Sequence, residues 1–272
     1  MADPFIIYQT MHYIQMTIVI SCLLFGSIMD IIKREVSDIP WLIMIITGIV
    51  TTIIMIVFAE ANQSRVGIMF GINVGVGIAM GLLLYYTGVM GGADAKAVIA
   101  LSFNTPVYFF GFAILEIPIY TWIPVIFNTF FNWLLAMVIF YPLPLLFYNI
   151  YLKLKGNDLF TNTEGNFAAK ILMLISGYLI PVNKAISRHN IVYSEVYNKD
   201  KEKWEIKHFM QVVEVEEEEK FKRKVEEDID KTGKDKIWVK VLPPGIVFLL
   251  IGYVVNILAG NLFFLLFHFT LG

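Results

Sequence analysis

The sequence predicts an all-α polytopic membrane protein with about six transmembrane helices and a small α+β cytoplasmic insertion before the last helix. The chain has 272 residues, of which 57% are hydrophobic and only 16% are charged. A soluble domain usually carries about a quarter of its residues as charged side chains. In addition, six long stretches contain no Asp, Glu, Lys or Arg, and most of the charged residues gather in one segment, 153–240.

The six uncharged stretches are long enough to cross a bilayer, because a helix needs roughly 20 apolar residues to span about 30 Å of hydrocarbon. They run over 4–29, 41–59, 66–93, 97–115, 117–152 and 241–272. The fourth is interrupted by Asn104 and Pro106, and the prolines of the fifth place its helix proper between Pro124 and Tyr141. We therefore expect a five-helix membrane region over 1–152, a soluble domain over 153–240 and a sixth transmembrane helix over 241–272.

The orientation in the membrane follows from the basic residues, which favour the cytoplasmic side. With both termini outside, Arg65 is the only one of 21 basic residues that faces out. The first stretch lacks a basic leader and ends at Asp30, so it is interpreted as a retained helix and not a signal peptide. These patterns predict a multi-pass protein of the cell membrane with the 153–240 segment in the cytoplasm.

The third stretch carries small residues at helical spacing, which predicts close packing against neighbouring helices in lipid. Gly67, Gly71 and Gly75 repeat every four residues, and Gly77 and Gly81 lie on a neighbouring face.

The soluble segment contains several kinds of element. The stretch 171–183 is apolar but too short to span, which indicates an interfacial helix or a local core. The stretches 191–197, 204–215 and 237–242 are rich in β-branched and aromatic residues and predict strands. The densely charged stretch 216–231 is typical of a solvated helix or a mobile loop.

Two aspartates lie at the predicted cytoplasmic boundary, where ionisable groups are costly and are functional candidates. Asp30 ends the first stretch, and Asp94 separates the third from the fourth. Two carboxylates held close together cannot both ionise cheaply, so the pair shares a proton and supplies both a base and an acid. The alternative is that each caps a helix or pairs with Lys33, Arg34 or Lys96.

Small residues precede Asp94 in the run Gly91-Gly92-Ala93. They permit unusual backbone angles and let a second backbone approach, as an extended substrate requires, although a glycine pair is equally expected in a turn. Ser27 lies three residues before Asp30 on the same helix face. Its hydroxyl is expected either to orient the Asp30 carboxylate or to bond its own helix backbone.

These motifs together resemble the archaeal preflagellin and prepilin peptidases, the type IV prepilin peptidase branch of the GxGD membrane aspartyl proteases. The likeness rests on Asp30 followed by a basic loop that ends at Pro40, and on Gly91-Gly92-Ala93-Asp94 opening the fourth helix. It implies that Asp30 and Asp94 are catalytic, and that the enzyme removes the short basic leader of prepilin or preflagellin precursors at the cytoplasmic face. Ala93 departs from the glycine that is usual at that position.

Other functions find less support in the sequence. A presenilin or signal-peptide-peptidase type protease would carry Tyr before Asp30 and a later Pro-Ala-Leu motif, both absent here. A proton-coupled transporter needs acidic groups near mid-span, whereas the spans carry only asparagines, which are expected to hydrogen-bond between helices: Asn73, Asn128, Asn132, Asn256 and Asn261.

Composition also limits the partners and cofactors. A net charge of -2 argues against a nucleic-acid partner. The single cysteine, Cys22, and four scattered histidines predict no metal site and no disulfide. No glycine-rich fingerprint suggests a methyl-donor site, so we expect a peptidase without a cofactor, working in the lipid bilayer.

Overall fold

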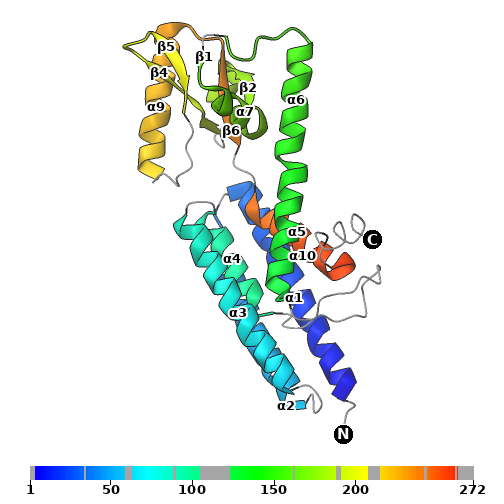
Figure 1. Cartoon of the computed structure of the whole chain (residues 1–272). Helices are drawn as coiled ribbons and strands as arrows, with labels where there is room; N and C mark the ends of the chain where they lie inside the picture. Colours follow the sequence, from blue (N-terminus) through cyan, green and yellow to red (C-terminus); the bar gives the residue numbers. More distant parts are fainter. Residues whose placement is uncertain are drawn as a thin grey trace. The chain divides into compact units, whose positions relative to one another are not determined.

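The computed structural model describes residues 4–33, 35–58, 63–87, 90–104, 123–161, 163–187, 191–207, 215–241, 244–260 and 262 (Figure 1). The chain divides into two compact units. One consists of Met1–Ala136 together with Pro244–Gly272, and the other of Met137–Pro243. Each is considered by itself.

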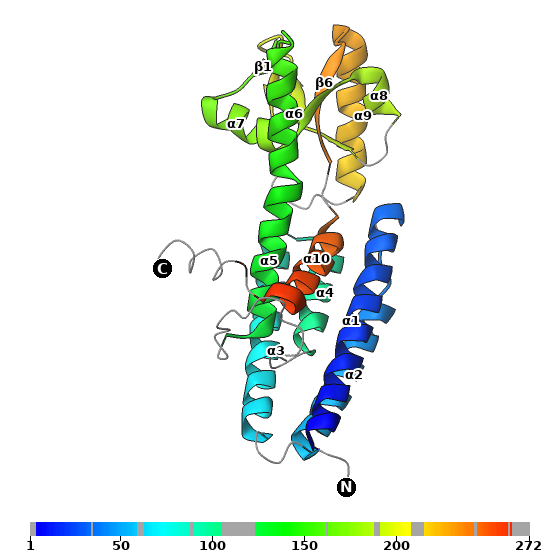
Figure 2. The same cartoon turned by 90° about the vertical axis from the view of Figure 1, so that its right-hand side faces the viewer.

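The first unit is a bundle of helices in which the last helix returns to the first (Figures 1 and 2). Its helices are α1 (Pro4–Lys33), α2 (Ile39–Phe58), α3 (Gln63–Tyr86), α4 (Gly92–Ser102), α5 (Val125–Phe140) and α10 (Gly245–Ala259). Helix α1 packs against α2 and α10, while α4 packs against α2, α3 and α10. Helix α10 therefore contacts both of the helices that carry the predicted catalytic aspartates.

Four described helical segments are long and apolar enough to cross a membrane: Phe5–Lys33, Ile39–Phe58, Ser64–Tyr86 and Val125–Leu154. They correspond to the first, second, third and fifth predicted spans. Helix α4 has 11 residues and α10 has 15, and residues 105–115 and 263–272 of the fourth and sixth predicted spans lie outside the described residues. A multi-pass membrane protein is supported, and the total of six spans stays a prediction.

Close packing of α3 is confirmed, but on a different face from the regular glycine stripe. A Cβ added at Gly77 would lie 2.2 Å from Ser102 Cβ, and one added at Gly81 would lie 2.6 Å from Ile99 Cγ1, so α3 meets α4 there. At Gly71 and Gly75 no described atom lies within 4 Å of an added Cβ. The prediction of close packing along the regular stripe is therefore wrong for the part of the bundle that the structure describes.

Two of the five asparagines predicted to link helices, Asn73 and Asn132, do so in this unit; for Asn128 and Asn256 the link stays a prediction. Asn73 Nδ2 donates to the carbonyl of Ser102 at 2.6 Å, and its Oδ1 accepts from the N–H of Ile126 at 2.9 Å. Asn132 Nδ2 donates to the carbonyl of Gly260 at 2.8 Å. These bonds satisfy backbone groups at helix ends, where water is not available in lipid. Asn261 lies outside the described residues.

The second unit confirms the small α/β region before the last helix. One antiparallel sheet has the order β2 (Tyr178–Pro181), β6 (Lys236–Val241), β3 (Ile191–Tyr193). The other has the order β1 (Thr163–Glu164), β5 (Lys203–Ile206), β4 (Glu195–Asn198), with β1 parallel to β5. The helices are α6 (Pro142–Leu154), α7 (Phe167–Ser176), α8 (Val182–Ile186) and α9 (Val215–Thr232).

Strands are present in each of the three predicted stretches, with two differences. Of the stretch 204–215 only its beginning is a strand, β5; residues 208–214 lie outside the described residues, and Val215 begins α9. The stretch 191–197 is split at Ser194 into β3 and β4, which belong to different sheets. The Ser194 N–H donates to the carbonyl of Trp238 at 3.0 Å, and its own carbonyl accepts from the Lys207 N–H at 2.9 Å. The apolar stretch 171–183 contains the end of α7 and also β2, and the charged stretch 216–231 lies within helix α9.

A buried ion pair lies between the two sheets. Glu195 is fully buried, and its Oε1 accepts from the Thr163 hydroxyl at 2.6 Å. Its Oε2 accepts from the Trp238 N–H at 3.1 Å and lies 2.8 Å from Lys234 Nζ. Burial lowers the pKa of Lys234, and the Glu195 carboxylate opposes that shift. Every oxygen of this carboxylate is therefore held by a partner from another element.

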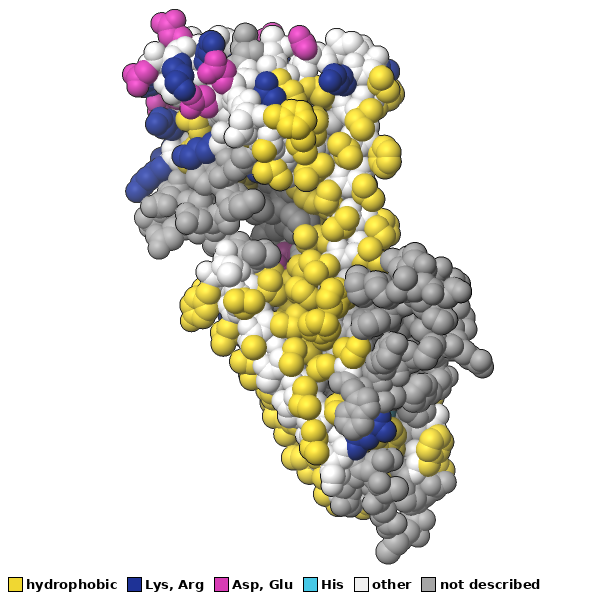
Figure 3. All heavy atoms as spheres, in the orientation of Figure 1, with side chains coloured by type: hydrophobic (Ala, Val, Ile, Leu, Met, Phe, Trp, Pro, Cys, Tyr) yellow, Lys and Arg dark blue, Asp and Glu magenta, His cyan; other side chains and the backbone are white. Residues whose placement is uncertain are grey.

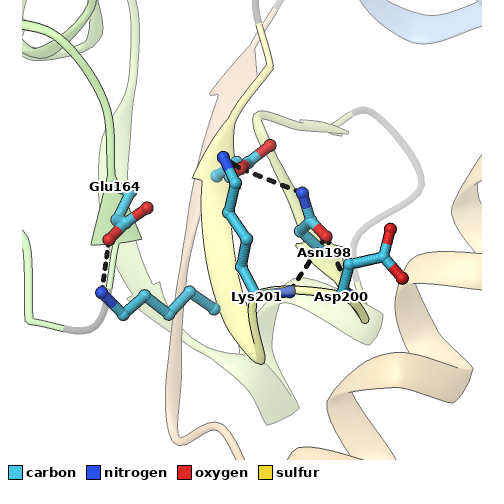
Figure 4. Close-up of polar contacts among 6 residues, drawn as sticks. Glu164, Asn198, Asp200 and Lys201 are labelled. Atoms are coloured by element: carbon cyan, nitrogen blue, oxygen red, sulfur yellow. Dashed lines mark hydrogen bonds and ion pairs between the residues drawn. The ribbon is translucent and has the colours of Figure 1, made fainter.

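The edge of the β1-β5-β4 sheet carries exposed polar contacts (Figure 4). Glu164 on β1 pairs with Lys203 on β5. At the turn between β4 and β5, Asn198 Oδ1 accepts from the N–H of Asp200 at 3.0 Å, which closes the turn. These contacts lie in water, where an ion pair contributes little to stability.

Candidate active site

Asp30 lies in the last part of α1, on the side of the helix that meets α10. Gly26 precedes it by one helical turn, and a Cβ added there would lie 2.9 Å from Trp41 Cη2 and 3.3 Å from Ile246 Cγ2. Residues four apart share a helix face, so Asp30 follows Gly26 along the face next to the first turn of α10. The Asp30 side chain is half-buried, and its Oδ2 is shielded from solvent.

Asp94 lies in the first turn of α4, whose N-cap residue is Gly91. Its carboxylate packs directly on Gly245, the first residue of α10. A Cβ added at Gly245 would lie 2.5 Å from Asp94 Oδ2 and 2.6 Å from Cγ, closer than real Cβ atoms approach other atoms. Any side chain at position 245 would displace the Asp94 carboxylate or the start of α10.

The first turn of α10 therefore contacts both aspartate-bearing helices, through Ile246 on the α1 side and through Gly245 on the Asp94 side. Helix α5 supports this turn from a third direction, because Trp133 Nε1 donates to the Gly245 carbonyl at 3.1 Å. The two aspartates are 64 positions apart in the sequence, and the structure brings both of their helices to the start of one helix.

Gly245 is the residue that the sequence analysis missed. The signal that points to it is local: Pro243, Pro244 and Gly245 stand together where the last apolar stretch begins. Proline is common at a helix start. The residues Pro-Pro-Gly thus indicate where the helix begins, whereas the lack of space for a side chain at position 245 is seen only in the structure.

The position of Asp94 also has an electrostatic consequence. Its carboxylate belongs to the first turn of α4 and contacts the first residue of α10. The first N–H groups of a helix have no partner within that helix and carry partial positive charge. Two helix starts therefore favour a negatively charged group at this point.

An exposed ion pair ties the α1–α2 connection to α4. Lys96 Nζ donates to Asp38 Oδ1 at 2.7 Å, and both side chains are more than half exposed. Lys96 is two residues beyond Asp94, so the segment that follows the Asp30 helix is attached beside the second aspartate motif. Arg34, the other basic residue expected near the aspartates, lies outside the described residues.

The run Gly91-Gly92-Ala93 leads into Asp94 with little side-chain bulk. Gly91 has φ -67° and ψ 161°, which any residue can adopt, so its glycine is not explained by an unusual backbone angle. Among the residues that the structure describes, a Cβ added at Gly91 would meet only Asp94 Oδ2 at 3.8 Å, and one added at Gly92 only Tyr85 Cε2 at 3.7 Å. The two glycines thus place no side chain of their own next to the carboxylate.

Ser27 is buried, with 4% of its side chain exposed. Its Oγ makes no hydrogen bond with any residue that the structure describes, either to Asp30 or to the α1 backbone. Its assignment as a residue that orients Asp30 stays a prediction.

Within the described ranges, no group of three or more His, Cys, Asp and Glu side chains is arranged to hold a metal ion. His12 is buried in α1 with its ring 4.6 Å from that of Tyr8. The other three histidines lie outside the described residues. The absence of a metal or cofactor stays a prediction.

Comparison with known proteins identifies the family. The model of the type IV leader peptidase family matches residues 17–145, which include Asp30, Asp94 and the run 91–93. The model of the archaeal peptidase A24 C-terminus, type II, matches residues 169–262, which include Gly245. No curated protein matches the chain. Two models of the same peptidase class thus match successive parts of the sequence, and the chain belongs to the type IV leader peptidase family, in its archaeal prepilin and preflagellin peptidase group.

Proposed function

We propose that the protein is a membrane aspartyl endopeptidase that removes the short basic leader of prepilin or preflagellin precursors, with Asp30 and Asp94 as its catalytic pair. Membership of the leader peptidase family supports the reaction. The observation that carries the mechanism is the contact of both aspartate-bearing helices with the first turn of α10, where Asp94 packs on Gly245.

In this mechanism one aspartate is ionised and the other is protonated. The ionised carboxylate takes a proton from a water molecule, whose oxygen then forms a bond to the scissile carbonyl carbon. The protonated carboxyl donates its proton to the carbonyl oxygen. The C–N bond then breaks as the leaving amine gains the proton that the first carboxylate took from water, and the oxygen returns its proton to the second carboxylate as the carbonyl of the new carboxyl group forms. The helix starts beside Asp94 stabilise negative charge, which suits it to the ionised role.

The substrate's backbone would lie along Gly91-Gly92-Ala93, where the lack of bulky side chains lets an extended chain reach the carboxylates. The leader's charges would stay in water while the following apolar helix remains in lipid. Ala93 still leaves a small side chain at the third position. We assign Ser27 to orienting the Asp30 carboxylate in the substrate complex.

The decisive experiment incubates membranes containing the protein with a prepilin and, separately, a preflagellin precursor, and sequences the new N termini. We expect one cut between the basic leader and the apolar helix, unaffected by a chelator. Asp30→Asn and Asp94→Asn proteins, which keep the side-chain shape and lose the titrating group, are the matched controls. A chelator-sensitive cut, or a cut that both variants still make, would overturn the aspartyl mechanism.

We also propose that this site faces the cytoplasm and that both termini lie outside, because the basic residues favour that orientation. The test replaces Cys22 by Ser and introduces single cysteines by Ser64→Cys, Asn198→Cys or Thr270→Cys. An impermeant thiol reagent applied to intact cells should label positions 64 and 270. Labelling of position 198 from outside would contradict the orientation.

A further inference from the structure

The outward side of α7 is apolar, which is unusual for a short helix at the surface of a soluble unit. Phe167 is 80% exposed, and Ile171 and Leu172 are 42% and 39% exposed. Met173, on the opposite side, is fully buried with Leu159 and Trp238. Since a surface helix normally turns polar residues outward, the exposed side of α7 requires a separate explanation.

Helix α6 adds a second apolar surface. Phe147, Tyr151 and Leu154 lie on one side of it at helical spacing and are 67%, 51% and 83% exposed. Asn149 attaches α6 to the end of α7, because its Nδ2 donates to the carbonyls of Leu174 at 2.8 Å and Gly177 at 2.7 Å. We call these apolar side chains together the α6–α7 surface: Phe147, Tyr151, Leu154, Phe167, Ile171 and Leu172.

The remainder of the same unit has a different surface. Figure 3 shows apolar side chains gathered over α6 and α7, and charged side chains gathered over β4, β5 and α9. Helices α6 and α7 contain no acidic residue, whereas α9 mixes acidic and basic residues along its whole length. On this face the exposed apolar side chains therefore gather over α6 and α7, and Ile186 of α8 is a further exposed apolar residue, 45% exposed.

Continuity with a membrane span indicates what covers this surface. Helices α5 and α6 form one apolar segment, Val125–Leu154, of 30 residues. At 1.5 Å per residue this segment is about 45 Å long, which exceeds the roughly 30 Å of the hydrocarbon layer. If α5 lies in the hydrocarbon layer, the excess length of the segment places part of α6 in the membrane interface. Helix α7 is attached to α6 through Asn149.

The charges on these helices fit a lipid surface. Lys153 lies in the last turn of α6 and Lys170 in α7, and Lys155 follows with its Nζ 4.7 Å from the centre of the Tyr151 ring. Lysines and aromatic rings next to an apolar face are typical of helices that lie in the membrane interface. Anionic headgroups attract such lysines.

We propose that α7 lies in the membrane interface, with Phe167, Ile171 and Leu172 among the lipid acyl chains, and that it anchors the Met137–Pro243 unit to the bilayer. The lysines of α6 and α7 favour a leaflet with anionic lipids. This role does not depend on the aspartyl mechanism, and its test does not use peptide cleavage as the readout.

The test uses the full chain with Cys22→Ser, so that one introduced cysteine carries an environment-sensitive fluorophore. Phe167→Cys and Ile171→Cys report on α7, and Lys199→Cys, at an exposed position beyond β4, is the matched control. In bilayers whose acyl chains are brominated, the labels at 167 and 171 should be strongly quenched and blue-shifted, and the label at 199 should not. A thermal unfolding transition equal to that of the Cys22→Ser protein checks that each labelled protein is folded.

Two results would overturn the proposal. Labels at 167 and 171 that emit as in water and are not quenched would show that lipid does not cover α7. The labels could instead be unquenched and show energy transfer between copies that disappears when the protein is diluted in lipid. That result would show that a second copy of the chain covers α7. The preference of the lysines for anionic lipid is tested separately. It would be overturned if quenching is no stronger in anionic than in neutral bilayers, or if Lys170→Gln does not change the quenching in anionic bilayers.

Discussion

Asp94 and Glu195 are two carboxylates in different units of the molecule, and their surroundings differ. Glu195 is fully buried between two sheets, with Thr163, Trp238 and Lys234 on its oxygens. Asp94 is half-buried, packs on a glycine at a helix start and follows a run of residues with little side-chain bulk. The comparison teaches that burial of a charge does not by itself indicate a reactive site, because a fully paired carboxylate such as Glu195 has no oxygen left for a substrate.

The difference also separates stability from activity. Removing one partner of a buried ion pair destabilises the fold, because the other charge is left unpaired in the low-dielectric interior of the protein. Asp94 lies in the first turn of α4 against Gly245, and an Asp→Asn change there keeps the side-chain shape while removing the group that takes up and releases a proton. We therefore expect changes at Glu195 to alter folding, and changes at the aspartates to alter cleavage.

The largest effect is expected from Asp30→Asn and Asp94→Asn. Either change should lower precursor cleavage by at least about 10³-fold, because the amide can neither take up nor release the proton. The measurement is the rate of leader removal in reconstituted membranes, with the thermal unfolding of each variant as a control. An Asn variant that melts normally and keeps a tenth of the activity would remove that residue from the mechanism.

Glu195→Gln should have the next largest effect, on stability. The change leaves the Lys234 ammonium buried without its carboxylate, which should cost about 3 to 5 kcal/mol in the free energy of unfolding. Denaturant unfolding in detergent, followed by tryptophan fluorescence, measures the loss.

The matched control is Glu164→Gln, which removes the exposed pair with Lys203 and should change stability little. The folded fraction of Glu195→Gln protein should cleave precursor at the normal rate. Equal stability of the two variants would show that the buried pair does not support the fold.

Gly245→Ala tests whether the start of α10 positions Asp94. The added Cβ would displace the carboxylate, and a shift of about 1 Å can cost on the order of 10²-fold in rate. The rate constant for cleavage should fall while substrate affinity changes much less. Gly71→Ala, at a glycine with no described atom within 4 Å of the added Cβ, is the control and should be fully active. Normal cleavage by Gly245→Ala protein would contradict the positioning role.

The smallest effect is expected at the exposed pair beside the site. Asp38→Asn removes the contact with Lys96, whose side chain is 56% exposed, and should change stability by no more than about 1 kcal/mol. Cleavage should fall less than about 5-fold at physiological salt and should converge with the unmodified protein at high salt. A much larger, salt-independent loss would place Asp38 or Lys96 in the reaction itself.

Much of the fold was predictable because its signals are local. The length of the uncharged stretches predicted four helical segments that are long and apolar enough to cross a membrane, and prolines predicted the α5 helix almost to the residue. The family was predictable from the residues around Asp30 and Asp94, since a short motif is complete within the sequence that carries it. The links that Asn73 and Asn132 make between helices were predictable, because lipid offers their side chains no other partner.

Other features depended on partners far away in the chain. The sequence placed Gly67, Gly71 and Gly75 on the most regular stripe, yet α4 packs on Gly77 and Gly81, because the position of α4 decides which face is covered. The stretch 191–197 showed one continuous β pattern. Its division at Ser194 follows from hydrogen bonds to Trp238 and Lys207 in other parts of the unit.

The sequence by itself determined the membrane segments, the soluble insertion and the two aspartate motifs, because apolar length and motif spacing act along the chain. Only the tertiary structure decided that Gly245 lies under the Asp94 carboxylate, that Glu195 is buried with Lys234, and that the apolar side of α7 faces outward. The physical reason is the same in each case. A side chain's environment is made by the elements that pack around it, and those elements come from distant parts of the sequence.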